Sequence, residues 1–249
     1  RNKNRAANSA GMTTQPVQLL RSTEQSEVVN IIRTLNRDDR VHGILVQLPL
    51  PSQIDESTII KSIHPDKDVD GLHPFNMGLL MAGNPRFVPA TPSGIQQMLL
   101  RSGVDPAGQH VVVCGRSNIV GKPLASLLLH RTSGGNATVT VCHSRTKNLT
   151  NITRQADILI AAIGQPSFIT AEMVKLGVVV IDVGINRIDS PERKRGYRLV
   201  GDVDYDAVSL KAAAITPVPG GVGPMTIAML LQNTLKAARY SSHLDTRKF

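Results

Sequence analysis

Residues 110–121 read HVVVCGRSNIVG, an apolar run followed by a glycine turn and a helical pattern that carries Pro123 in its first turn. A strand, a tight turn and a helix N-terminus in this order are typical of a dinucleotide fingerprint, because the helix amides and dipole favour a phosphate there. The match is incomplete, since Gly115 and Arg116 are followed by Ser117 where the fingerprint has its second glycine. The alternative is an ordinary strand-to-helix turn.

Further apolar runs recur along the chain at a regular spacing. With the first, they lie at about 110–114, 137–142, 158–163 and 177–183, and a shorter one lies near 213–216. Helical patterns separate them, for example at 119–129 and 171–176. Buried strands that alternate with helices predict βαβ units and a parallel sheet covered on both faces, and therefore an α/β fold.

The ends of the predicted strands favour NADP over NAD. Folds that bind NAD commonly carry an acid after the second strand for the ribose 2′-hydroxyl. Here residues 142–145 read CHSR, and residues 106–156 contain no acid. Arg116 and Arg145 could pair with a 2′-phosphate, and Ser144 could donate a hydrogen bond to it. A solvated basic loop is the alternative.

Two segments near the C-terminal end carry glycine turns. Residues 180–187, VIDVGINR, predict a buried strand whose following turn presents Ile185, which either packs on a nicotinamide ring or belongs to the core. Residues 219–223 precede a helix predicted to begin near Pro224. Glycine-rich loops at helix starts can cradle phosphates, but the prolines here indicate a rigid wall instead.

The first 90 residues contain two further patterns. Helical spacing over about 28–35 follows Ser22-Thr23, which looks like a helix cap. Residues 43–51, GILVQLPLP, predict a short apolar strand stopped by prolines, with Gln47 as its only polar side chain. Burying an amide costs about 1–3 kcal/mol unless it is hydrogen-bonded, so Gln47 either caps backbone groups or binds another side chain.

Three acids in the predicted loop at residues 64–71 imitate the opening of a calcium site. Asp66, Asp68 and Asp70 are followed by Gly71, but the twelfth position is Met77, which cannot be the bidentate ligand. Calcium is therefore rejected.

Composition limits the class of partner. The 249 residues carry 28 Lys and Arg against 19 Asp and Glu, and residues 72–150 hold six of the nine surplus charges. A local excess without interleaved aromatic residues argues against nucleic acid and favours a phosphorylated small molecule. No apolar run is long enough to span a bilayer, which excludes a membrane protein. Cys114 and Cys142 have no metal-ligand spacing, and they predict a reduced, cytoplasmic chain without a metal.

Five segments together resemble one family. They are VQLPLP (46–51), PDKDVDG (65–71), GRS (115–117), VGIN (183–186) and TPVPGGVGPMT (216–226). Over nearly its whole length, up to about Arg239, the chain resembles the bifunctional methylenetetrahydrofolate dehydrogenase/methenyltetrahydrofolate cyclohydrolases of the bacterial type. The resemblance implies two α/β lobes around a cleft. These are a folate-binding catalytic lobe (1–90), a Rossmann NADP-binding domain (91–221), and a C-terminal helix that returns to the first lobe with a polar, frayed tail (222–249).

The resemblance also assigns roles to residues. The opening RNKNRAA is similar to the end of the family's Tyr-x-x-x-Lys motif, which makes Lys3 the catalytic lysine and residues 3–10 a helix rather than a transit peptide. The motif tyrosine is expected four residues before Lys3, ahead of this chain's first residue. Gln47 is then expected to bind Lys3, and Asp70 to bind the amino and ring nitrogens of a pterin. The implied substrate residues are Val46, Gln47, Leu48, Pro49, Asp70, Pro219, Gly220, Gly221, Val222 and Gly223, and the cofactor residues are Gly115, Arg116, Ser117, Ser144, Arg145 and Ile185.

The implied activity couples two reactions in a homodimer joined through the Rossmann domain. NADP⁺ oxidises 5,10-methylenetetrahydrofolate to the 5,10-methenyl cation, and water then opens the ring to give 10-formyltetrahydrofolate. Three alternatives stay open. They are a monofunctional NADP-dependent dehydrogenase of related fold, a non-catalytic module that binds phosphate or nucleic acid, and an inactive chain that lacks the motif tyrosine.

Overall fold

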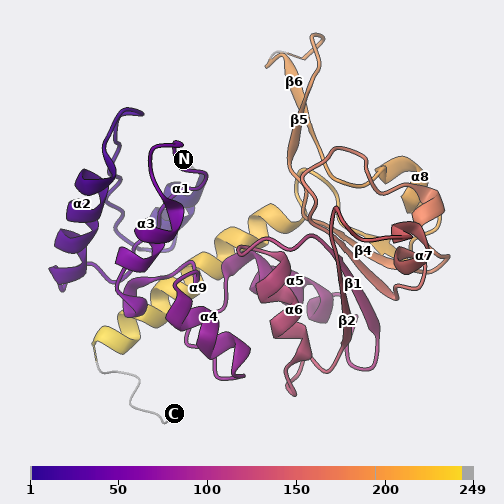
Figure 1. Cartoon of the computed structure of the whole chain (residues 1–249), viewed down its shortest axis with the longest axis horizontal. Coiled ribbons are helices and arrows are strands. Elements are labelled where there is room, and N and C mark those ends of the chain that lie inside the picture. Colours follow the sequence, from indigo (N-terminus) through magenta and orange to yellow (C-terminus); the bar gives the residue numbers. More distant parts are fainter. Residues whose placement is uncertain (1, 194, 243–249) are drawn as a thin grey trace. The chain divides into compact units, whose positions relative to one another are not determined.

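The structure is a computed structural model that describes residues 2–193 and 195–242 (Figure 1). The chain divides into two compact units. The first runs through Ala90 and resumes at Ile227, and the second is Thr91–Thr226. Helices α5 (Ala90–Arg101) and α9 (Val222–Ser241) contain the two boundaries. Within the described ranges, no helix is long and apolar enough to cross a membrane.

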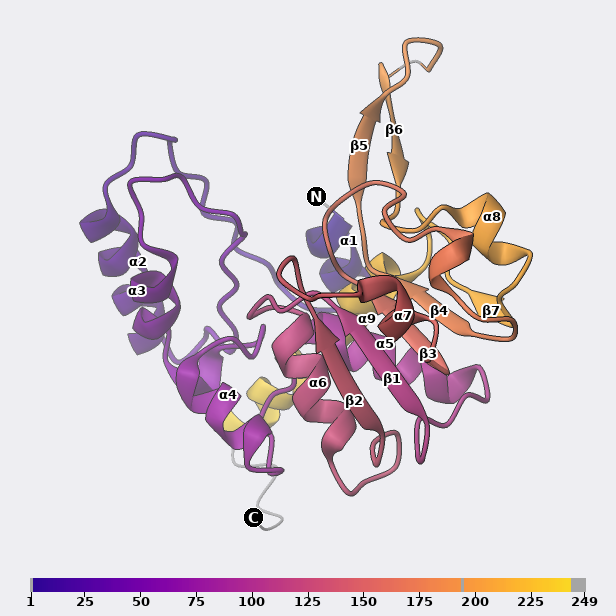
Figure 2. The ribbon, with the colours of Figure 1, turned by 45° about the vertical axis from the view of Figure 1, so that its right-hand side comes forward.

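The second unit is built on a five-stranded sheet in which every pairing is parallel. In spatial order, visible in Figure 2, the strands are β2 (Thr138–Cys142), β1 (His110–Cys114), β3 (Ile158–Ala161), β4 (Val179–Asp182) and β7 (Ala214–Ile215). These positions lie within the five predicted apolar runs. The predicted α/β fold with a parallel sheet is therefore confirmed.

Helices cover both faces of this sheet. Val111 and Val113 pack on one face with α5 and α6 (Gly121–Leu129). Val112 and Leu159 pack on the other face with α7 (Leu149–Thr153), the 3₁₀ turn η2 (Ala171–Met173) and α8 (Tyr205–Ser209). Burial on both faces explains why β1 and β3 are continuous apolar runs rather than alternating ones.

The two cysteines lie inside the sheet. Cys114 and Cys142 are free and buried, and they are partners in the register between β1 and β2. Burial raises the pKa of Cys114 to about 12 and shifts the pKa of Cys142 in the same direction. Both side chains are therefore neutral thiols near neutral pH, and the reactive thiolate form is scarce.

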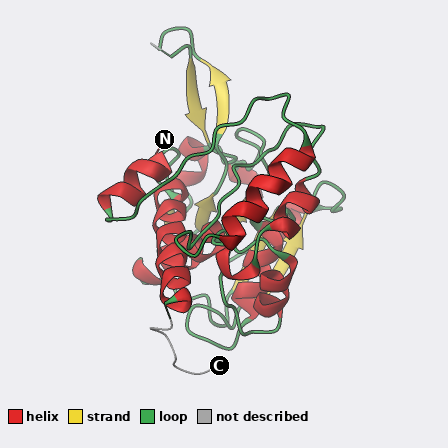
Figure 3. Cartoon of the chain, turned by 90° about the vertical axis from the view of Figure 1, so that its left-hand side faces the viewer, coloured by secondary structure: helices red, strands yellow, loops and turns green. Residues whose placement is uncertain are grey.

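The first unit consists of helices and connecting loops, drawn in red and green in Figure 3. Its helices are α1 (Asn2–Ser9), α2 (Gln25–Arg37), α3 (Glu56–Ser62), the 3₁₀ turn η1 (Pro65–Lys67), α4 (Pro74–Met81) and the later part of α9. Helix α1 confirms the helix predicted at the start of the chain. On α9, the Asn233 amide donates to the carbonyls of Val69 and Val88, each at 2.9 Å, and so holds α9 against two loops of its own unit.

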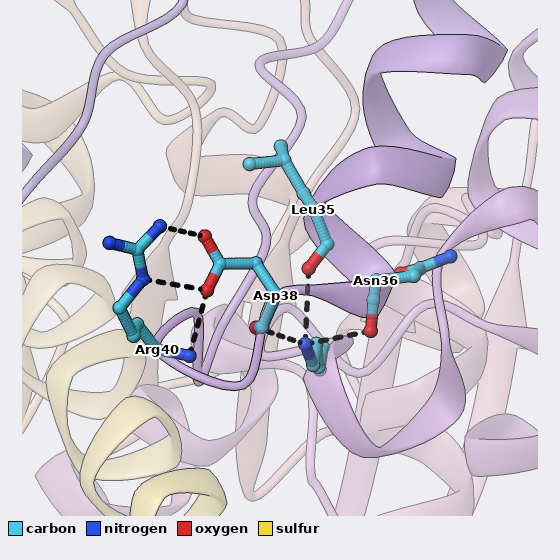
Figure 4. Close-up of polar contacts among 5 residues, drawn as sticks. Leu35, Asn36, Asp38 and Arg40 are labelled. Carbon is cyan, nitrogen blue, oxygen red and sulfur yellow. Dashed lines mark hydrogen bonds and ion pairs between the residues drawn. The ribbon is translucent and has the colours of Figure 1, made fainter.

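Lys67 fixes its loop against the C-terminal end of α2. Its ammonium donates to the carbonyl oxygens of Leu35, Asn36 and Asp38 at 3.0, 2.8 and 2.8 Å, which satisfies acceptors that a helix end leaves open. In Figure 4 these carbonyl groups converge, and the guanidinium of Arg40 makes two hydrogen bonds to the carboxylate of Asp38. One lysine thus joins two segments that are distant in sequence.

Two predictions in the first unit are wrong. Residues 43–51 form no strand, because a strand needs a ladder of pairings and Ile44 alone makes one, a parallel bridge to Asp68. Helix α2 is not capped by Ser22-Thr23. Its N-cap is Glu24, whose backbone is extended and whose side chain makes no capping hydrogen bond.

Two differences occur in the second unit, and a third is the start of α9. The helix predicted over residues 171–176 is only the 3₁₀ turn η2, because the backbone becomes extended at Val174. An antiparallel hairpin of β5 (Asn186–Asp189) and β6 (Tyr197–Val200) was not predicted, and it projects from the unit in Figures 1–3. Helix α9 starts at Val222, two residues before the predicted start, and continues through Ser241. The sequence predicts a polar, frayed tail at residues 239–249, but residues 239–241 belong to α9. Residues 243–249 of that tail lie outside the described residues.

We expect Leu124→Ala to destabilise the protein and Leu129→Ala to leave its stability nearly unchanged. Both leucines belong to α6, but Leu124 is fully buried against the sheet whereas Leu129 is 58% exposed. Truncating a buried leucine costs about 2–5 kcal/mol because it leaves a cavity. Urea denaturation of the two variants measures the difference, and equal free energies of unfolding would contradict the described packing.

Candidate active site

Three segments of the first unit bring Lys3, Gln47 and Asp70 together. The Lys3 ammonium of α1 donates to Oε1 of Gln47 at 3.4 Å, and the positive charge of Lys3 acts on the carboxyl of Asp70. The amide of Gln47 also donates to the carbonyl of Leu48 at 3.1 Å. Gln47 therefore both binds Lys3 and contacts backbone, although it is exposed rather than buried as predicted.

Asp70 has an unusual environment for a carboxyl group. Its pKa is raised to about 6, chiefly by burial; Lys3 opposes the shift and the neighbouring Asp68 adds to it. The proton of Asp70 is therefore exchanged near the pH at which proton-transfer groups are most effective. Asp70 precedes Gly71, whose positive φ of 70° turns the chain and brings it against the backbone of Pro89.

Asp68 is hydrogen-bonded within its own loop and to α4. It is 1% exposed, and its carboxylate accepts hydrogen bonds from the N–H groups of Leu72 and His73 and from the Asn76 amide. Asp66 instead forms an ion pair with Arg86. Among the described residues, no group of three His, Cys, Asp or Glu side chains could hold a metal ion.

The other substrate residues of the first unit lie on the same segment as Gln47. Val46 packs on the core that α2 and α3 share, Leu48 is half-buried and Pro49 is exposed. The peptide between Leu48 and Pro49 is cis. The structure therefore presents Gln47 and Pro49 to the outside while Val46 holds their segment to the core.

The turn after β1 requires glycine at two positions. A side chain on Gly115, whose φ is 135°, would collide with the carbonyl of Ala162, and one on Gly121 would collide with the carbonyl of Gly115. The Ser117 hydroxyl turns back and accepts the N–H of Val120 at 3.1 Å. Ser117 can therefore replace glycine, because its side chain is engaged with the loop itself.

Arg116 and Arg145 follow neighbouring strands. The register pairs Cys114 with Cys142, so the loops after β1 and β2 leave the sheet side by side. Arg116, Ser144 and Arg145 are all exposed. Two guanidinium groups and a hydroxyl free to face solvent fit a phosphate on the adenosine ribose, so the donor set suits NADP.

Ile185 and the segment 219–223 complete the predicted set. Ile185 is 64% exposed, so the interpretation of Ile185 as a core residue is wrong. Pro219 and Gly220 are exposed, Gly221 and Val222 are buried, and Gly223 is intermediate. The N–H of Gly221 bonds to the carbonyl of Pro217 at 3.0 Å, which closes a turn directly before α9. This turn is compact.

A pocket of about 680 Å³ lies within the second unit, beside β6 and α8. Its lining includes Pro219 but none of the six predicted cofactor residues. Three arginines (Arg193, Arg195 and Arg198) and three aspartates (Asp182, Asp204 and Asp206) belong to its lining.

Sequence reasoning missed two buried carboxyl groups in the second unit. Asp182 and Asp202 are 3% and 0% exposed. Desolvation raises the pKa of Asp182, against the effect of the backbone N–H groups that bond to it. Asp182 is the single acid in the apolar run 178–183, and this isolation was the available signal. The sequence around Asp202 carries no comparable signal.

Comparison with known proteins decides the family. The model of the tetrahydrofolate dehydrogenase/cyclohydrolase catalytic domain matches residues 1–70, and that of the NAD(P)-binding domain of the same family matches residues 89–242. The chain belongs to the tetrahydrofolate dehydrogenase/cyclohydrolase family. The family and the dehydrogenase/cyclohydrolase activity predicted from the sequence are thus confirmed.

Relatives in the family match over most of their length. The bifunctional protein FolD of Salinibacter ruber is 61% identical over 239 residues, which cover 96% of this chain and 80% of that protein. Among solved structures, the bifunctional FolD enzyme of Campylobacter jejuni has a TM-score of 0.89 at 49% identity, covering 96% of this chain and 82% of the other. The Trypanosoma brucei FolD enzyme, solved with NADP and an inhibitor, has a TM-score of 0.91 at 43% identity, covering 96% and 81%.

We expect the carboxyl of Asp70 to titrate near pH 6 and the Lys3→Met variant to titrate at higher pH. The ammonium favours the charged carboxylate, so its removal raises the pKa of Asp70. Carbon-13 NMR of the aspartate carboxyl groups, with Asp70→Asn to assign the signal, measures both values. Arg5→Met on the same helix is the control. A wild-type midpoint near the ordinary 3.8, or no change in Lys3→Met, would contradict the described geometry.

Proposed function

We propose that this chain oxidises 5,10-methylenetetrahydrofolate with NADP⁺ and hydrolyses the resulting 5,10-methenyl cation to 10-formyltetrahydrofolate. The observation that carries the proposal is the meeting of Lys3, Gln47 and Asp70 from three segments of the first unit. The family supplies the reaction type, and this arrangement supplies a proton carrier, a partner that orients it and a carboxyl group for the substrate.

When bound, NADP⁺ supplies the acceptor for the hydride that the methylene carbon loses. Arg116, Ser144 and Arg145 hold its 2′-phosphate, and Gly115 and Ser117 provide the turn for its pyrophosphate. Ile185 offers an exposed apolar surface to the nicotinamide ring. The NADP complex of the related trypanosomal enzyme supports this cofactor. We assign these residues their roles as part of the proposal.

In the hydrolysis, water adds to the methenyl carbon, and the proton it loses must be carried away as the ring opens. We assign this transfer to Lys3, whose Nζ is held by the Gln47 side-chain oxygen at 3.4 Å. The neutral form of the amine accepts a proton from the attacking water, and the ammonium so formed donates it to the ring nitrogen as the C–N bond breaks. The second proton of the water goes to solvent as the formyl group forms. Asp70 accepts hydrogen bonds from the amino and ring nitrogens of the pterin. Val46, Leu48 and Pro49 contribute the remaining substrate contacts of the first unit, and Pro219–Gly223 contribute those of the second.

Two finer points of the proposal concern assembly and location. We propose a homodimer that associates through the second unit, because β2 is an edge strand whose Val141 remains 37% exposed. We propose a cytoplasmic location, which the two free, buried thiols support.

We expect wild-type protein to oxidise methylenetetrahydrofolate faster with NADP⁺ than with NAD⁺. Arg116→Ala and Arg145→Ala should each lower kcat/KM for NADP⁺ by about 10- to 100-fold, because a hydrogen bond to a charged group contributes roughly 1.5–3 kcal/mol. The rate with NAD⁺, which has no 2′-phosphate, should change little. Absorbance of the methenyl product and of NADPH measures both rates.

Arg131→Ala is the matched control for these variants, because Arg131 lies between α6 and β2, at the opposite edge of the sheet. A wild-type preference for NAD⁺ would overturn the role of the two arginines. Absence of turnover with both cofactors would overturn the proposed function as a whole.

We expect Lys3→Met to lower the cyclohydrolase rate by about 100-fold or more, because a positioned acid–base group contributes roughly 10²–10⁴-fold. The hydride transfer depends more on alignment and should fall less. Decay of methenyltetrahydrofolate absorbance measures the first rate and NADPH formation the second. Lys61→Met, an exposed lysine on α3, is the control. If Lys3→Met leaves both rates unchanged, Lys3 is not catalytic. A wild-type protein that reduces NADP⁺ but does not hydrolyse methenyltetrahydrofolate would favour a monofunctional dehydrogenase.

A further inference from the structure

Asp182 and Asp202 form a buried pair at the carboxyl edge of the parallel sheet. Asp182 is the last residue of β4, and Oδ1 of its carboxylate accepts the N–H groups of Gly184 and Asp202 at 3.0 and 2.9 Å. Its Oδ2 accepts the N–H of Val203 at 3.0 Å. The first carboxylate therefore fixes both the turn after β4 and the segment that carries the second carboxylate.

Asp202 extends the connection to a third loop. Its Oδ2 accepts the N–H groups of Ile163 and Gly164 at 2.6 and 2.8 Å, in the loop that follows β3. Its Oδ1 accepts the side-chain amide of Asn186 at 2.8 Å, directly after Ile185. A single side chain thus joins the loop after β3 to the segment after β4.

Two glycines let the backbone pass directly against the two carboxylates. A side chain on Gly184 would collide with the carboxylate of Asp202, and one on Gly201 would collide with the carboxylate of Asp182. Each carboxylate receives three N–H donors, which compensates its burial. Such a network has few alternative conformations, and it therefore specifies the positions of the loops that it joins.

The position of this network along the sheet edge indicates which part of the cofactor it serves. Dinucleotides bind across the carboxyl ends of parallel strands, with the adenosine ribose at the end of the second strand. Arg116 and Arg145 place that ribose at β1 and β2. The loops after β3 and β4 lie on the other side of β1 in the strand order, where the nicotinamide half must extend.

We propose that Asp202, held by Asp182, is a positioning residue for the nicotinamide half of the cofactor site. It sets the turn that presents Ile185 and the loop at residues 163–164, and it does not touch the adenosine half. This inference rests on the proposed use of NADP.

The test compares the binding of NADP⁺ with that of adenosine 2′,5′-bisphosphate, which has the 2′-phosphate but no nicotinamide. Asp202→Asn replaces one acceptor oxygen by an NH₂ group, which then faces an N–H donor. At least one of the hydrogen bonds between the loops is therefore lost. We expect this variant to raise the dissociation constant of NADP⁺ by about tenfold or more and that of the bisphosphate by less than about twofold. Isothermal titration calorimetry measures both dissociation constants.

Two further variants make the result decisive. Asp204→Asn is the matched control, because Asp204 lies two residues away and its carboxylate accepts the N–H of Ala207 in α8. Both ligands should bind this variant as they bind the wild type. Asn186→Ala removes the hydrogen bond from the Ile185 turn to Asp202 and keeps both carboxylates. NADP⁺ should therefore again bind more weakly, while binding of the bisphosphate should change little. This variant decides the question if Asp202→Asn fails to fold in a thermal melt.

The positioning role would be overturned if Asp202→Asn and Asn186→Ala weakened the binding of both ligands equally, or weakened the binding of neither. A wild-type protein that binds the bisphosphate and NADP⁺ with equal affinity would also overturn it, because the nicotinamide half would then add nothing. Failure of the wild type to bind either ligand would instead overturn the proposed cofactor.

Discussion

The parallel pairing of β1, β2, β3 and β4 is the constraint on which the second unit depends. Parallel strands end at the same edge, so four loops that are far apart in sequence leave the sheet together. Helices must return the chain for each strand, and they bury both faces on the way. Strand pairing alone therefore brings the glycine turns, the arginines and the buried carboxylates to one edge of the sheet. These residues need no contacts with one another to reach it.

The first unit reaches a similar result by different means. Its segments are held by side chains that satisfy backbone groups, with Lys67 on the end of α2 and Asp68 on two N–H groups. The charges of Lys67 and Asp68 are thus occupied by hydrogen bonds within the unit. Asp70 lies two residues after Asp68; Lys3 stabilises its charged carboxylate, whereas burial raises its pKa. Neighbouring acids of one loop therefore differ in role because their hydrogen-bond partners differ.

Local patterns made much of the fold predictable. The strands lie where apolar runs predict them, because burial on both faces leaves a continuous signal, and the joint occurrence of five motifs indicated the family. Residues 43–51 have the same composition as a strand but find only one pairing, which composition cannot reveal. The β5–β6 hairpin was missed because its strands are partly exposed and polar. The Asp202 network was missed because its partners lie 16 to 39 residues away.

The two cysteines have a consequence for how the sheet can be observed. Cys114 and Cys142 end adjacent strands, are buried and carry thiols that burial keeps protonated. An alkylating reagent can reach them only after β1 and β2 separate from their covering helices. The chain therefore contains its own two-site reporter of sheet opening, and the rate of native alkylation records how often the dinucleotide-binding edge comes apart.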